Sequence, residues 1–475
     1  MNTQQIVSPY LGIFERPLED DSIESFEYFE YLPRDSSNMN KSGDHIIDVN
    51  DENIYQLPHK AYLEVRGKLV KTDGSDYAAT DNIALTNNGW SLFQSLKYHI
   101  NNKLVEEISQ YLPQASTIMN LVLFSDDYSR SSATNMMWYR DTAKGEAKTN
   151  EFTKGSELIA VGTVGDANAL NGGPFRTGLD LFARKADYNM GFKIRQTLAA
   201  GSKQFTMLLP LSGVLGSHRD INTVMFGVRH SYILTRATVG NYIHRADAAA
   251  DGRFVINHLS LWMPRVEPKL SIKVGLEEKL VSGDKQQLHF EQLRIYRQQF
   301  GSAVTKTTWK VASYPNGELP RHIFIAFASV ERDDDQEQNN QVFDNANLTR
   351  LFARINSKQY PEQILETDFS TASRNYTRAY MMFQEAMHKY SDTDSGSQVS
   401  VEDFASLYPI FHIDVSKHKD ELKLGHAEVT LGWTLSESFK KLAGGGASDY
   451  HVYCLVQNDR YLTVEAMTGK MNIIV

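Results

Sequence analysis

The sequence has a single cysteine, Cys454, among 475 residues, so no disulfide can form within one chain. This excludes a disulfide-stapled secreted scaffold and a cysteine-rich zinc module, and it suits folding in a reducing compartment. No apolar run approaches the roughly 20 residues that span a bilayer. The N-terminus also lacks the basic start and apolar core of a signal peptide. We therefore expect neither a transmembrane segment nor a secretory leader.

The sequence also has fewer basic than acidic residues. The chain carries 49 Lys and Arg residues against 58 Asp and Glu residues, a formal net charge of −9. A surface that grips phosphates has to be basic, so we expect no specific nucleic-acid binding. The content of 41% hydrophobic and 23% charged residues is that of an ordinary globular protein. The length suits two domains rather than one.

The stretch Trp90–Arg130 carries the clearest pattern of secondary structure in the sequence. Leu96, Tyr98 and Ile100 alternate with polar residues, which is typical of a half-buried strand. The pair Asn101-Asn102 follows, and asparagine tolerates positive φ, so a two-residue hairpin turn is expected before a second strand at 103–108. Apolar spacing then predicts a helix over 116–124.

The same order of elements returns later in the chain. Aligning Leu351 with Leu96 places Asn356 on Asn101, and a helix predicted from Tyr376 to Tyr390 falls where the first helix does. This repeat predicts that the chain holds two copies of one all-β unit.

The rest of the chain reads as short strands joined by turns, which favours a sandwich or barrel. With about eight strands and one helix per unit, we predict an all-β double jelly roll, that is, two eight-stranded antiparallel β-sandwiches, each with a short helix. The other expected strands are 25–32, 46–49, 59–70, 205–211, 223–236, 254–266, 288–298, 307–313, 322–331, 409–415, 424–434, 449–456 and 461–475.

Three segments are expected along the chain. Residues 1–24 form an N-terminal arm, which is either loosely held or ordered on a neighbouring subunit. Residues 25–266 form the first jelly roll, with long polar excursions at 131–178 and 237–252. Residues 267–475 form the second, opening with a helix at Lys269–Gly283 that Gly283 caps.

We predict no catalytic, cofactor-binding or metal-binding residues. Asp333–Asp335 lacks the spaced oxygen ligands and turn glycine of a calcium loop, and a solvated acidic loop is the simpler interpretation. His412 and Asp414 share a strand face, but no spacing completes a metal site. No Gly-x-Ser-x-Gly elbow is present. Cys454 lies in an apolar strand and is expected to be a buried small hydrophobe rather than a nucleophile.

Several segments, in this order, resemble the double jelly-roll major capsid proteins of Polinton/Maverick-like elements and adintoviruses. Asn102 stands where that family usually has glycine. The likeness spans nearly the whole chain, and the segments that carry it are 25–33 (SFEYFEYLP), Asp44–Val49, Tyr62–Leu69, Ile100–Val105, 137–142 (MWYRDT), Leu259–Val266, the strand opening near Leu288 and Arg378–Phe383 (RAYMMF).

The resemblance implies a structural capsid protein without enzyme activity or cofactor. It implies a homotrimer that forms a pseudo-hexagonal capsomer and tiles an icosahedral shell. Neighbouring capsomers, penton proteins and minor capsid proteins would be its partners, and it would be located in the virion after assembly in the cytoplasm or nucleus of the host cell. The long excursions would be capsomer towers or inter-subunit clasps.

Two alternatives stay open from the residues. A glycoconjugate hydrolase built on two jelly rolls requires a cleft between the rolls lined by paired carboxylates. A glycan-binding module requires an exposed aromatic platform, for which Trp138 and Tyr139 are the candidates; both side chains fit a core equally well.

Overall fold

The computed structural model describes most of the chain. The described residues are 22–41, 43–51, 53–143, 189–246, 249–314, 318–370, 372–386, 396–417, 426–440, 446–465 and 470–473. Residues 1–21 of the expected arm, most of the 131–178 excursion and the end of the helix expected at 376–390 lie outside these ranges.

The first sandwich consists of two antiparallel sheets. Sheet 1 has the order β1-β11-β4-β8, with the short β3 paired to β11, and sheet 2 has the order β2-β9-β6-β7. The bounds are β1 Ile23–Tyr31, β2 Asp44–Val49, β3 Tyr55–Gln56, β4 Tyr62–Lys71, β6 Phe93–Ile100, β7 Lys103–Ile108, β8 Phe205–Pro210, β9 His230–Arg236 and β11 Gly252–Pro268.

The second sandwich repeats this arrangement. Sheet 3 has the order β12-β19-β14-β17, with β20 on β19, and sheet 4 has the order β13-β18-β15-β16. The bounds are β12 Gln286–Phe300, β13 Lys306–Tyr314, β14 Pro320–Ser329, β15 Leu348–Ile355, β16 Lys358–Glu366, β17 Phe411–Asp414, β18 Ala427–Leu435, β19 Tyr450–Glu465 and β20 Lys470–Ile473.

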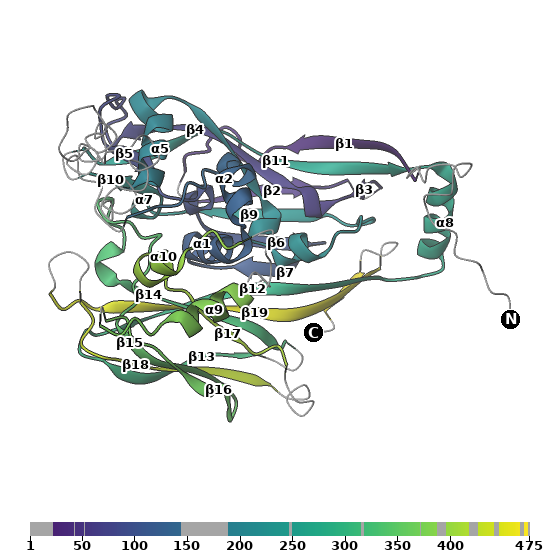
Figure 1. Cartoon of the computed structure of the whole chain (residues 1–475). Helices are drawn as coiled ribbons and strands as arrows, with labels where there is room; N and C mark the ends of the chain where they lie inside the picture. Colours follow the sequence, from purple (N-terminus) through teal and green to yellow (C-terminus); the bar gives the residue numbers. More distant parts are fainter. Residues whose placement is uncertain are drawn as a thin grey trace, which may run out of the picture.

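The two sandwiches share one topology. If the main strands of each are counted along the chain, sheets 1 and 3 both pair the first, eighth, third and sixth strands, and sheets 2 and 4 both pair the second, seventh, fourth and fifth. This is the jelly-roll order, so the predicted double jelly roll is confirmed. Figure 1 shows the four sheets stacked from sheet 1 at the top to sheet 4 at the bottom. Buried apolar residues from all four sheets form one continuous cluster.

Helices occupy the connections between strands. The α-helices are α1 Leu112–Leu123, α2 Asp126–Arg130, α5 Met190–Ala199, α6 Gly216–Asp220, α7 Val239–Tyr242, α8 Leu270–Val281, α9 Thr377–Glu385 and α10 Val401–Ser406. Short 3-10 turns are η2 Pro58–Lys60, η3 Gly89–Leu92, η4 Ser132–Met136, η5 Ala200–Ser202, η6 Leu211–Gly213 and η7 Val330–Arg332, and a small ladder joins β5 Ile83–Leu85 to β10 Ile243–Arg245. None of the helices in the described ranges has the length and apolarity needed to cross a membrane.

The repeated hairpin has the geometry that its asparagines predict. Ile100 pairs with Lys103 and Ile355 pairs with Lys358, so both hairpins close with a two-residue turn. Asn101 and Asn102 have φ of 50° and 63°, and Asn356 has φ of 54°. Asparagine tolerates this left-handed region better than most residues, which explains its use at both turns.

Several element boundaries differ from the predictions. Helix α1 begins at Leu112 rather than Ser116, because Pro113 fits the first helical turn, where no amide partner is needed. Strand β9 begins at His230 rather than Thr223, since Gly227 adopts φ of 75° and breaks the extended run. Strand β1 begins at Ile23, inside the expected arm.

The sequence predicts two separate strands, at 449–456 and 461–475, and the break between them is wrong. A single strand, β19, runs through Gln457, Asn458, Asp459 and Arg460, all of which are buried. These polar residues look like a turn in the sequence. In the structure Asp459 accepts from Arg321 at 2.6 Å and Arg460 donates to Glu318 at 2.9 Å, so tertiary partners keep the strand intact.

The first hairpin yields a stability prediction. Asn102→Pro fixes φ near −65°, which is incompatible with the observed 63°, so the turn has to rearrange. We expect a loss of more than about 3 kcal/mol in the free energy of unfolding, and little soluble protein. Asn102→Gly, which reaches positive φ freely, is the matched control and should keep the wild-type urea midpoint. A wild-type midpoint for the proline variant would contradict the turn assignment.

Candidate functional site

Polar side chains are buried at the contact between the two sandwiches, and Glu106 is one of them. Its carboxylate accepts from the Gly216 amide at 2.9 Å, from the Ser217 amide at 3.0 Å and from the Ser217 hydroxyl at 2.8 Å. The Leu293 amide of β12 lies 3.4 Å away. Burial raises the pKa of Glu106, although these hydrogen bonds oppose the rise. One side chain thus joins β7, α6 and the second sandwich.

A serine and a histidine next to Glu106 look superficially like hydrolase machinery. Ser217 Oγ lies 3.1 Å from His218 Nδ1, and His218 Nε2 lies 2.8 Å from the Tyr232 hydroxyl. Both Ser217 and His218 are buried. A nucleophilic serine has to reach its substrate, and here the hydroxyl points to Glu106 instead. The arrangement is that of a packed hydrogen-bond network.

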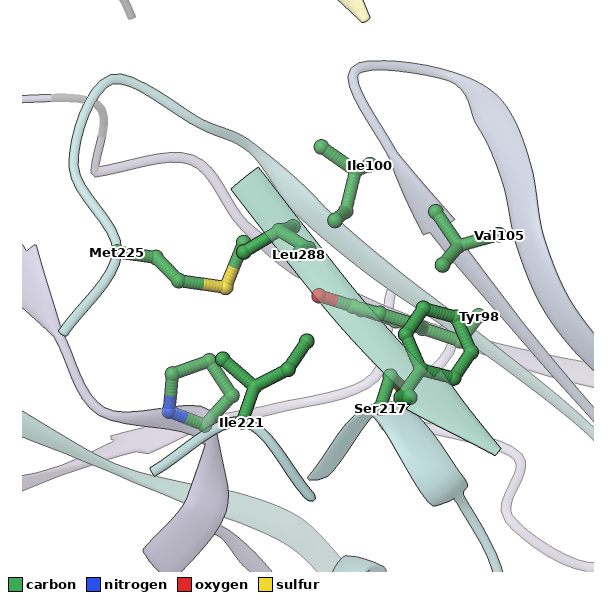
Figure 2. Close-up of a pocket in the computed structure, with 9 residues that line it drawn as sticks. Tyr98, Ile100, Val105, Ser217, Ile221, Met225 and Leu288 are labelled. Atoms are coloured by element: carbon green, nitrogen blue, oxygen red, sulfur yellow. The ribbon is translucent and has the colours of Figure 1, made fainter. Parts of the chain in front are cut away.

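The cavity beside this network is too small for a substrate. It measures about 10 Å³, the space of roughly one water molecule. Figure 2 shows its lining, in which Ile100, Val105, Ile221, Met225 and Leu288 close around the space. The lining comes from both sandwiches, so this is a packing gap at their contact, and it offers no cleft with paired carboxylates.

A second polar cluster ties the first sandwich to the second through a buried ion pair. Arg195 on α5 donates to Asp141 at 2.7 Å, and both side chains are fully buried. Arg195 also donates to the Leu85 carbonyl at 2.8 Å. From the second sandwich, Asn339 donates to the other Asp141 oxygen at 2.9 Å, and the Tyr408 hydroxyl donates to the Asp141 carbonyl at 2.9 Å. Every strong polar group of the pair therefore has a partner.

The excursion at 237–252 was predicted to be a polar loop, and this is wrong in part. It forms α7 and β10 and packs against the acidic loop at Asp333–Asp335. The Gly240 amide donates to Asp334 at 3.2 Å, and a Cβ at Gly240 would lie 2.3 Å from Asp334 backbone. The Arg245 amide donates to the Gln336 carbonyl at 2.8 Å. This excursion of the first sandwich therefore packs against a loop of the second sandwich in the same chain.

The acidic loop is therefore not simply solvated. Burial alone would raise the pKa of Asp333, but the His451 hydrogen bond at 2.7 Å and the Arg297 guanidinium at 2.8 Å lower it. Asp335 accepts from the Glu337 amide at 2.9 Å. Protein groups thus engage all three carboxylates of Asp333–Asp335.

Three other residues that the sequence analysis considered are buried within the protein. His412 is buried, contacts His322 at 3.0 Å and lies 2.8 Å from the Met382 carbonyl on α9. Cys454 is fully buried, and burial raises the pKa of its thiol. Trp138 is buried and donates to Gln398 at 3.0 Å, so it belongs to the core and not to an exposed platform.

The described surface does carry an aromatic platform, but elsewhere. Phe26 and Tyr28 on β1, each 39% exposed, lie beside Tyr62 on β4 and Trp262 on β11. We call these four residues the aromatic face. Their strand neighbours Leu63, Leu261 and Met263 are buried in the core, so the alternation of strand side chains places the aromatic face on the other side of sheet 1. The alternating aromatics of SFEYFEYLP were the sequence signal for it, and sequence analysis did not assign them a role.

Charged groups border the aromatic face. Glu64 accepts from the Trp262 indole at 2.8 Å and from Arg66; burial alone would raise the pKa of Glu64, but these bonds lower it. His258 Nε2 lies 2.8 Å from Glu30. Glu30, Glu64 and His258 bring possible metal-ligand atoms within 4.8 Å of one another. Their existing hydrogen bonds satisfy them without an ion.

The buried ion pair yields a prediction. Arg195→Met leaves the Asp141 carboxylate buried without its cation, which we expect to cost about 3–5 kcal/mol of the free energy of unfolding. The double variant Arg195→Met/Asp141→Leu should recover part of this loss. Arg130→Met removes an exposed ion pair with Asp126 and should cost under about 1 kcal/mol. Urea denaturation measures all three; equal small losses would contradict the assigned role.

Buried neutral histidines yield a pH prediction. Burial lowers the pKa of His230 to about 3 and those of His244 and His412 to about 4. The unfolded chain binds these protons near pH 6.5, so stability is complete above that pH and is lost as pH falls towards 4. Each unit of pKa difference is worth about 1.4 kcal/mol. Urea midpoints should therefore drop steeply between pH 6.5 and 5, before most carboxylates titrate.

His412→Asn provides the control for this pH dependence. Asparagine can still donate to the Met382 carbonyl but does not titrate, so the slope of stability against pH should fall by the share of one histidine. A wild-type midpoint that stays constant from pH 7 to 5 would contradict the assignment of neutral buried histidines.

The fold of the whole chain is similar to that of several solved viral structures. The fold is similar to a chain in the cryo-EM structure of the Sputnik virophage, with 11% identity, a TM-score of 0.57, and coverage of 100% of this chain and 93% of that chain. It is similar to the Faustovirus major capsid protein, with 8% identity, a TM-score of 0.54, and coverage of 96% and 92%. It is also similar to a chain of the quasi-atomic model of the PBCV-1 virus capsid, with 10% identity, a TM-score of 0.51, and coverage of 97% of this chain and 99% of that chain.

These identities are low, so the structural matches show a shared fold. A search of curated protein sequences finds no match. A family model matches more directly: residues 183–462, which include strands of both sandwiches, match the model described as Double jelly roll-like domain. The chain belongs to this double jelly roll-like domain family.

Proposed function

We propose that the chain is a viral major capsid protein that forms a homotrimeric, pseudo-hexagonal capsomer and tiles an icosahedral shell. The motif resemblance favours the Polinton/Maverick-like and adintovirus group, and the similar folds in the Sputnik virophage, Faustovirus and PBCV-1 structures support a capsid role. The protein would be located in the virion shell, after assembly inside the host cell. Neighbouring capsomers, penton proteins and minor capsid proteins would be its partners.

The observation that carries the proposal is a difference between two equivalent sheet faces. In sheet 3, the 11 residues from Tyr450 to Arg460 are all buried, so β19 is covered on both of its faces. The outer cover comes from the first sandwich: Tyr111 packs 5.9 Å from Tyr453, and the Arg297 guanidinium lies 4.4 Å from the Tyr111 ring. Sheet 3 is thus covered by the sandwich that precedes it.

Sheet 1 occupies the equivalent position in the first sandwich but has no such cover in the described chain. Its outward side presents the aromatic face, and Arg66 on the central strand β4 is exposed. Aromatic and arginine side chains are enriched at protein interfaces. An aromatic sheet face whose equivalent is buried in the same chain fits a surface that another subunit covers.

The opposite end of the chain supplies the matching surface. In the first sandwich, β7 contacts β12 through Glu106 and so covers sheet 3. Its equivalent in the second sandwich is β16, where Lys358, Glu362 and Glu366 are exposed and Ile364 is partly exposed. If the contact within the chain is repeated between chains, the β16 side of one subunit covers the aromatic face of the next.

Such a contact is head-to-tail, so it closes into a ring or grows into a filament. Three chains contribute six similar sandwiches, and a ring of six has the near-hexagonal outline that tiles a flat facet. We accordingly propose a division into a first roll at 25–266 and a second at 267–475, each supplying one lobe of the capsomer.

The alternative functions have less support. The described cavity at the sandwich contact is of water size, which disfavours a hydrolase cleft there. Of the two sequence candidates for a glycan platform, Trp138 is buried in the core and Tyr139 packs against the core while partly buried. A net charge of −9 fits a shell that does not itself condense nucleic acid.

The trimer interface is tested by charge insertion on each proposed surface. Tyr28→Asp on the aromatic face and Ile364→Asp on β16 should each convert the trimer to monomer at micromolar concentration, because an unpaired carboxylate is buried on association. Native mass spectrometry distinguishes one from three copies of the 53.8 kDa chain. Leu198→Asp is the matched control, since Leu198 on α5 is 40% exposed but lies on neither surface.

Two results would overturn the proposal. A wild-type chain that stays monomeric would remove the capsomer. A trimer that survives both Tyr28→Asp and Ile364→Asp would remove the assigned interface. Wild-type circular dichroism spectra for the monomeric variants would show that the substitutions act on association and not on folding.

A further inference from the structure

Helix α8 joins the two sandwiches and has no buried residue. Four of its apolar side chains are exposed, Leu270 at 73%, Ile272 at 45%, Val274 at 46% and Val281 at 74%, whereas Leu276 and Leu280 are half-buried. Figure 1 shows α8 at one end of the molecule, between the ends of β11 and β12. At 3.6 residues per turn, Leu270, Val274 and Val281 share one side of this 12-residue helix and form an exposed apolar stripe, whereas Ile272 lies on the opposite side.

The sequence of α8 does not sustain a helix by propensity alone. Ile272, Val274 and Val281 are β-branched, and Gly275 in the interior costs about 1 kcal/mol relative to alanine. Isolated helices of about 12 residues are marginal in water. The C-terminal end is capped, since Gly283 has φ of 86° and the Asp284 amide donates to the Lys279 carbonyl at 3.1 Å. The rest of the helix needs a packing partner.

The chain itself delivers a suitable segment to this helix. The Lys269 amide, next to the first residue of α8, donates to the Ser22 carbonyl at 2.9 Å. Ser22, the first described residue, therefore lies at the N-terminal end of α8. Fully extended, 21 residues reach up to about 70 Å, whereas α8 rises only about 18 Å.

The composition of residues 1–21 complements the helix. Apolar residues cluster in the first part, at Ile6, Tyr10, Leu11, Ile13 and Phe14. The acidic run at 19–21 directly precedes Ser22 in the sequence, and Ser22 is hydrogen-bonded to Lys269. At the foot of α8, a groove of about 220 Å³ lies between Phe29, Tyr55 and Lys273. Lys273 is the residue of α8 that lines this groove, together with residues of β1 and β11.

We propose that the N-terminal segment of the same chain docks on α8, with its apolar residues between Ile6 and Phe14 covering Leu270, Val274 and Val281. Docking within one chain is favoured because the tether at Ser22 raises the effective concentration to about the millimolar range. The inference rests on α8 and the tether, and it holds whether or not the chain forms a capsomer.

The test is a cross-link in the full-length chain. Ile13→Cys/Val274→Cys is treated with a short bis-maleimide, and the native Cys454 stays silent because it is fully buried. We expect an intramolecular cross-link, seen as a monomer band and a bridged peptide pair. The matched control, Ile13→Cys/Leu198→Cys, carries its second thiol on exposed α5 and should cross-link at least tenfold less.

Every outcome of this experiment decides the proposal. A covalent dimer would overturn it in favour of docking on a neighbouring copy, and cross-linking no greater than the control would overturn docking on α8 altogether. Hydrogen exchange gives an independent measurement: Ile13→Asp/Phe14→Asp should speed exchange of the α8 amides at least tenfold and leave β4 unchanged. Unchanged α8 exchange would also overturn the proposal.

Discussion

The burial of charge between the two sandwiches is the constraint on which the rest of the structure depends. Glu106, Asp141 and Arg195 lose water on folding, and each recovers hydrogen-bond partners from segments far apart in the sequence. A half-satisfied buried charge is strongly destabilising, so these networks tolerate little sliding of one sandwich over the other. Sliding would break these hydrogen bonds, so the buried networks favour a single relative arrangement of the two sandwiches.

The sequence predicts the local elements of this fold well and their ends less well. The hairpin at Asn101-Asn102 and its repeat at Asn356 were accessible because asparagine at positive φ is a local property. The break expected between 456 and 461 was wrong because Gln457–Arg460 resembles a turn, and only partners such as Glu318 and Arg321 keep it in a strand. Tertiary contacts decided that boundary, and no window of sequence contains them.

The aromatic face and the buried ion pair also differ in how far the sequence predicts them. Alternating aromatics in 25–33 signalled an unusual strand face, but the sequence does not say whether that face meets its own chain or another. The Asp141–Arg195 pair left no signal, since the two residues are far apart in sequence and become neighbours only when α5 packs against β5. Periodicity reports which residues are buried within one sandwich, and it is silent on pairings between sandwiches.

The duplicated topology has a consequence for how substitutions act. Sheets 1 and 3 hold equivalent places, yet sheet 3 is covered within the chain and sheet 1 presents the aromatic face to its surroundings. Substitutions at equivalent positions therefore have different effects. On the outer face of sheet 3 they change the packing and stability of the folded chain, and on the outer face of sheet 1 they change an exposed surface. A protein built from one sandwich would carry both demands on one surface. Joining two copies lets selection act on each demand separately.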